Sequence, residues 1–152
     1  MAQHKKPEFL SISQLLGRIG AEGGWTLVLA QRSFEWDDNR ICNLVDSLLE
    51  GFPIGSLLVV GGKDKARGYA MDGSRHGGRQ TVQGTAQVLD GQQRCLSIQA
   101  AFTDTGLDPE TDKARQLWIH VGAENSHRRP FHPKQGRRVR LHWTNRKAVN
   151  EL

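Results

Sequence analysis

Residues 88–94 have the sequence Val-Leu-Asp-Gly-Gln-Gln-Arg, in which an apolar pair is followed by an acid-glycine turn, two amides and an arginine. Apolar side chains then recur at helical spacing, at Cys95, Ile98, Ala101 and Phe102. The stretch therefore predicts a strand, a tight turn and the N-terminus of a helix.

Such a turn suits a bound anion, because the N-terminus of a helix carries unpaired amides and a partial positive charge. Gly91 allows a ligand to approach the main chain closely. Arg94 can form two hydrogen bonds with a phosphate, and Asp90 can hold a metal ion or orient water. A purely structural alternative stays open, in which Asp90 caps the helix and Arg94 pairs with it.

A second informative stretch lies upstream, where residues 31–38 are Gln-Arg-Ser-Phe-Glu-Trp-Asp-Asp. Residues 41–49 follow with apolar side chains at the spacing of an amphipathic helix. Asp37 or Asp38 is a suitable N-cap, and Gly51 is a suitable residue to end the helix. We therefore predict a helix between these residues.

The chain continues with Phe-Pro-Ile-Gly at residues 52–55, and an apolar run at residues 57–60 predicts a buried strand. The order of these motifs, Arg-x-Phe-x-Trp, helix, Phe-Pro-Ile-Gly, strand and Asp-Gly-Gln-Gln-Arg, resembles the N-terminal domain of GmrSD-type modification-dependent (type IV) restriction enzymes. The resemblance covers roughly residues 8–122. It implies a mixed α/β fold of the ParB/sulfiredoxin type, with a small mixed sheet and packed helices.

The resemblance also implies an activity, because the family's glutamine motif is associated with binding and hydrolysis of a nucleoside triphosphate. The matching positions are Asp90, Gly91, Gln92, Gln93 and Arg94. We expect the main chain of residues 91–93 and Arg94 to cradle the phosphates, and the two glutamine amides to orient phosphate oxygens or water. We expect Asp90 to bind Mg²⁺ or position that water. Arg32, from the upstream motif, would add a second positive charge.

For domain organisation, we predict a nucleotide-binding domain at residues 1–125 and the start of a downstream region at residues 126–152. Within the first domain, residues 61–85 are rich in glycine and basic side chains, so we predict a solvated loop there, an insertion rather than a flap over the site. Family members normally continue into a helical region and often an HNH nuclease domain. Nuclease activity is therefore expected only in such a downstream domain or subunit.

Positive charge is concentrated near the C-terminus. Residues 113–152 contain ten basic and two acidic side chains, a balance of +8, whereas the whole chain carries +5. Arg137, Arg138 and Arg140 alternate with apolar residues here, as expected of a strand with one basic face that contacts DNA, in this system a modified duplex. The alternatives are a solvated surface or a face that meets the downstream domain.

Composition and missing motifs limit the remaining possibilities. The 152 residues suit one domain, and no apolar run reaches the length of a membrane span or a signal peptide, so we expect a cytoplasmic protein. A Walker motif and paired zinc-binding cysteines are lacking, and Cys95 is expected to be buried, which disfavours sulfiredoxin chemistry. A non-enzymatic nucleic-acid-binding module, a protein-interaction adaptor and a homodimer remain open as alternatives.

Overall fold

A computed structural model describes residues 6–19, 23–30, 34–71, 80–103, 116–119 and 141–144. The elements follow one another as α1 (Ile12–Ile19), β1 (Trp25–Leu27), α2 (Asp38–Leu49), β2 (Leu58–Tyr69), β3 (Thr81–Asp90), α3 (Gln92–Phe102), β4 (Gln116–Ile119) and β5 (Leu141–Thr144). The mixed α/β class predicted from the sequence is confirmed.

The first three strands close on one another, since each of them pairs with the other two. β2 and β3 form a long antiparallel hairpin, and β1 runs parallel to β3 with Thr26 opposite Gln87. β1 also meets the end of β2, where Leu27 lies opposite Tyr69. The result is a small mixed sheet, as predicted.

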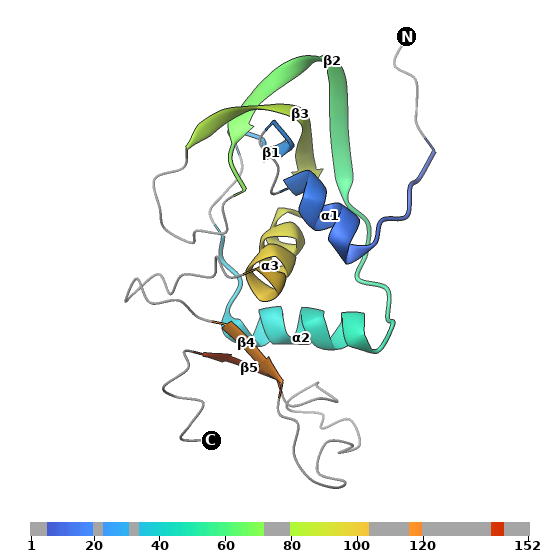
Figure 1. The fold of residues 1–152 in the computed structure, drawn as a ribbon, viewed down its shortest axis with the longest axis vertical. Helices are drawn as coiled ribbons and strands as arrows, with labels where there is room; N and C mark the ends of the chain where they lie inside the picture. The colour runs from blue at the N-terminus through green and yellow to red at the C-terminus, as the bar shows by residue number, and fades with distance from the viewer. Residues whose placement is uncertain are drawn as a thin grey trace, which may run out of the picture.

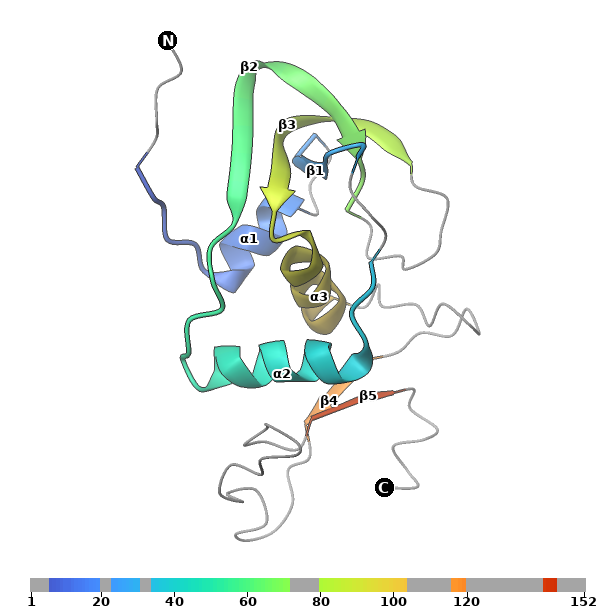
Figure 2. The same cartoon turned by 180° about the vertical axis from the view of Figure 1, so that it is seen from behind.

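The three helices and the second pair of strands stack below this sheet (Figure 1). α3 lies between the strands and α2, and the antiparallel β4–β5 pair lies on the far side of α2 (Figures 1 and 2). α2 contacts both α3 and β5, while α3 also contacts α1 and β4. α3 is therefore the central helix, and most of its side chains are buried.

Local signals explain where the helices begin and end. Ser11 and Gln14 form a capping box at α1, since each main-chain amide donates to the other residue's side chain. Asp37 caps α2 by accepting from the Arg40 amide at 2.8 Å. α2 ends before Gly51, whose φ of 73° is the left-handed conformation expected there.

The prediction of a glycine-rich loop at residues 61–85 is wrong, because most of this range belongs to β2 and β3. Two of its glycines, Gly68 and Gly84, allow close packing. A Cβ atom on Gly68 or Gly84 would collide with Thr26 of β1 and with neighbouring main-chain oxygens. The glycines thus make room for β1, which closes the sheet. Residues 72–79 of the same range lie outside the described residues.

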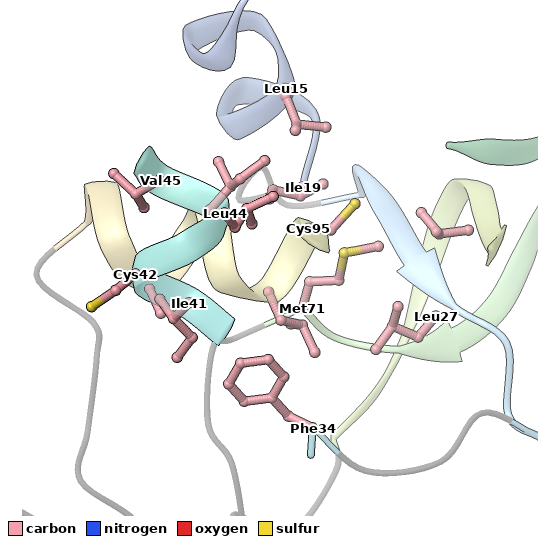
Figure 3. Packing of buried hydrophobic residues seen from close by; sticks show 14 residues of the cluster. Leu15, Ile19, Leu27, Phe34, Ile41, Cys42, Leu44, Val45, Met71 and Cys95 are labelled. Atoms are coloured by element: carbon pink, nitrogen blue, oxygen red, sulfur yellow. The ribbon is translucent and has the colours of Figure 1, made fainter. Parts of the chain in front are cut away.

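The hydrophobic core lies between the sheet and the three helices. Figure 3 shows its buried side chains, with Phe34, Ile41 and Met71 in one cluster with Leu27 of β1. Cys42 and Cys95 are both buried and form no disulfide bond with each other, and the burial of Cys95 was expected from the sequence. In the described part of the chain, no helix has the length and apolar character needed to cross a membrane.

Candidate functional site

The predicted strand, turn and helix at residues 88–94 are all present. β3 ends at Asp90, Gly91 forms the turn, and α3 begins at Gln92. The first intrahelical hydrogen bond runs from the Cys95 amide to the Gly91 carbonyl at 3.0 Å. The positive end of the α3 dipole therefore points at the Asp90–Gly91 turn.

Gly91 is required here for a structural reason. Its φ is 91°, a conformation that side-chain-bearing residues rarely adopt, and an added Cβ would collide with the Leu57 side chain. Gly91 is also the N-cap of α3, and no side chain caps the helix. The alternative in which Asp90 serves as the helix cap is therefore wrong.

Asp90 itself is exposed, with 73% of its side chain accessible. The carboxylate contacts Arg94, whose Nη2 lies 3.4 Å from a carboxylate oxygen. The contact is long and one partner is solvated, so it adds little to stability. The Asp90 carboxylate thus contributes little to the stability of the fold.

Arg94, by contrast, helps to hold the fold together. Its side chain is 18% accessible, and Nη1 donates to the Ile54 carbonyl oxygen at 3.0 Å. Gly55 lies directly against this guanidinium group, and a Cβ there would collide with Nη1. The Phe-Pro-Ile-Gly segment therefore holds the Arg94 side chain in place, a relationship that the sequence did not reveal.

The two glutamines of the motif differ in their surroundings. Gln93 contacts the upstream stretch, because its Oε1 accepts from the amides of Glu35 at 2.9 Å and Trp36 at 3.2 Å. Gln92 is buried, with 4% exposure, among the core side chains of α3. The turn thus unites three segments that are distant in sequence, namely residues 34–37, 52–55 and 90–94.

Several predicted site residues lie outside the described residues. Arg32, proposed as a second positive charge, is one, and the basic residues Arg137, Arg138 and Arg140 are the others. Among the described residues, no group of three or more His, Cys, Asp or Glu side chains could hold a metal ion. Asp90 is therefore the only predicted metal ligand that can be placed.

Cys95 follows Arg94 but is fully buried, as expected from the sequence. Burial raises the pKa of its thiol to about 11, although the nearby Arg94 charge acts in the opposite direction. A thiol with this pKa carries very little thiolate at neutral pH, and thiolate is the reactive form. Redox chemistry of the sulfiredoxin kind is accordingly disfavoured at this turn.

Comparison with protein families gives a match over residues 12–149 to the GmrSD restriction endonuclease, N-terminal domain. The chain belongs to this family. The match covers all eight helices and strands of the described residues, so the GmrSD N-terminal domain is the unit to which the turn belongs. No curated protein and no solved structure gives a significant match. Membership of the GmrSD family makes the chain a component of a restriction system, a form of phage defence.

Proposed function

We propose that this chain is the nucleotide-binding domain of a modification-dependent restriction system, and that it hydrolyses a nucleoside triphosphate with Mg²⁺. Family membership supports the restriction system. The observation that supports nucleotide binding is the pairing of an exposed carboxylate, Asp90, with the guanidinium group of Arg94 at the positive end of α3.

The phosphates would occupy the positive side of this pair. Arg94 has its Nη1 anchored on Ile54, while Nη2 points toward Asp90. A phosphate oxygen would make a shorter, charge-assisted hydrogen bond with Nη2 than the present 3.4 Å contact. The α3 dipole favours the same anion, since its effect is strongest within the first helical turn.

Asp90 fits a magnesium ion in this setting. Mg²⁺ is commonly held by one or two carboxylates together with phosphate oxygens and water, so a single exposed aspartate beside the phosphates suffices. The ion would neutralise charge on the phosphates. Asp90 would hold it or orient the attacking water, and Arg94 would balance the remaining negative charge.

The same carboxylate argues against the alternative function, a non-enzymatic module that grips bare DNA phosphate at this turn. An aspartate that is 73% accessible would repel an uncompensated phosphate, whereas a metal-bound triphosphate brings its own positive ion. DNA, in the form of a modified duplex, is proposed to be the target of the whole system. A downstream HNH nuclease domain or subunit is proposed to cut it.

The direct test is ligand binding by the full 152-residue chain. Thermal shift and calorimetry with each of the four nucleoside triphosphates, with and without Mg²⁺, should reveal a stabilisation that requires both components. Phosphate release should follow for the nucleotide that binds. A folded sample that shows no Mg²⁺-dependent response to any of the four would refute the proposal.

A further inference from the structure

The Gln93 side chain spans two parts of the chain that are 58 residues apart in sequence. It projects from the first turn of α3, and its Oε1 accepts from the main-chain amides of both Glu35 and Trp36. A carboxamide oxygen has two lone pairs, and two donors at 2.9 and 3.2 Å use both of them. This oxygen is therefore committed to the main chain.

The segment that it holds is fixed on either side as well. Phe34 is buried in the core, with 6% exposure, and Asp37 caps α2 through the Arg40 amide. Between these two fixed points, Gln93 anchors the main chain of residues 35–36 against the turn. The segment belongs to the Arg-x-Phe-x-Trp motif, in which the sequence analysis gave a chemical role to Arg32 alone.

We infer that Gln93 is a positioning residue, which acts on the nucleotide site through the main chain of Glu35 and Trp36 rather than through contact with the phosphates or water. This role rests on the proposed function for its catalytic consequence, but the held segment is a property of the fold alone. Gln93 then has a different task from the one expected, because its Oε1 already accepts from two main-chain amides and cannot also accept from a water molecule.

Three substitutions at this position separate the two roles. Gln93→Glu keeps an acceptor oxygen for both amides and removes the side-chain N–H donor. Gln93→Ala removes the acceptor, and Gln93→Asn withdraws it by one methylene, which provides a second variant if Gln93→Ala does not fold. Gln83→Ala is the matched control, since Gln83 is an exposed glutamine on β3 opposite Arg67.

The first measurement is hydrogen exchange at the Glu35 and Trp36 amides in the full chain without nucleotide. Loss of the acceptor should speed their exchange about tenfold in Gln93→Ala and Gln93→Asn. Gln93→Glu and Gln83→Ala should exchange at the parental rate. Unchanged exchange in folded Gln93→Ala and Gln93→Asn would overturn the inference, whether or not the chain hydrolyses any nucleotide.

The second measurement is steady-state hydrolysis. A positioning role predicts that Gln93→Glu keeps its kcat while Gln93→Ala loses it, with any charge effect of the new carboxylate confined to KM. If Gln93→Glu protects both amides but loses kcat as fully as Gln93→Ala, the side-chain amide acts directly and the inference is wrong. If the parent hydrolyses nothing, the proposed function fails, and the exchange data alone decide the role of Gln93.

Discussion

Arg94 of α3 donates from Nη1 to the carbonyl oxygen of Ile54, 40 residues earlier in the chain, at 3.0 Å. Its neighbour Gln93 accepts from the main chain of Glu35 and Trp36. The first of these partners follows α2 and the other two precede it. Gln93 and Arg94, two consecutive residues of α3, thus hold the segments that precede and follow α2.

Gly55→Ala should destabilise the fold more than a glycine substitution of equal backbone strain. Gly55 has a φ of 85°, and the new Cβ would also displace Nη1 of Arg94. Gly51→Ala is the matched control, because its φ is 73° but nothing lies within 4 Å of the added atom. We expect a loss of about 1 kcal/mol for Gly51→Ala and about 2–4 kcal/mol for Gly55→Ala, measured by urea unfolding. Equal losses would show that the contact with Arg94 contributes nothing.

Asp90→Asn should separate stability from chemistry. The carboxylate is largely exposed and its contact with Arg94 is 3.4 Å long, so the free energy of unfolding should change by no more than about 1 kcal/mol. The Mg²⁺-dependent response to nucleotide and any hydrolysis should disappear, because the carboxamide carries no charge for the ion. Turnover equal to that of the parent would remove Asp90 from the catalytic assignment.

The buried thiol of Cys95 should lower the stability of the fold at alkaline pH. The pKa of its thiol is about 11 in the folded chain and has its ordinary value of 9.0 in the unfolded chain, so the folded state retains the proton between these two limits. Stability is therefore fully present below pH 9 and is lost as pH rises from 9 to 11, by about 1.4 kcal/mol per pH unit at most.

The measurement is the slope of unfolding free energy against pH for the parent and for Cys95→Ala. The substitution should lower stability at every pH, because a buried side chain becomes smaller, but it should flatten the slope between pH 9 and 11. The comparison cancels the contributions of all other ionisable groups, because these groups are the same in both proteins. Identical slopes would mean that the thiol does not contribute.

The basic residues near the C-terminus are predicted to bind DNA. If the segment with its +8 balance contacts a phosphate backbone, duplex binding should weaken with salt by a logarithmic slope of about 0.9 for each neutralised phosphate. Replacing Arg137, Arg138 and Arg140 together should reduce that slope and leave nucleotide binding unchanged. A triple variant with the parental slope would assign DNA recognition to other residues.

Signals that act within a few residues could be recognised in the sequence. The N-cap at Asp37 and the end of the helix at Gly51 were both predicted, because each depends on local hydrogen bonds and backbone preferences. The turn before α3 was predicted from the same kind of pattern.

Tertiary partners could not be recognised in this way. The acceptor of Arg94 is a main-chain carbonyl and the donors to Gln93 are main-chain amides, and such groups are present at nearly every residue. The glycine-rich composition of residues 61–85 led to the wrong prediction of a loop for a related reason. The need for glycine at positions 68 and 84 is explained by the closeness of β1, and β1 is remote in sequence. Composition alone could not distinguish this packing from a solvated loop.

The double duty of the turn affects how the motif should be interpreted in other chains. Gly55, Gly91 and Arg94 would be retained by selection for stability even in a descendant that had lost all nucleotide chemistry, because the fold itself depends on them. Asp90 has no comparable protection, since its side chain is exposed and caps nothing. In a family of such domains, a replaced aspartate within an otherwise intact motif would therefore be the first mark of a member that has become inactive.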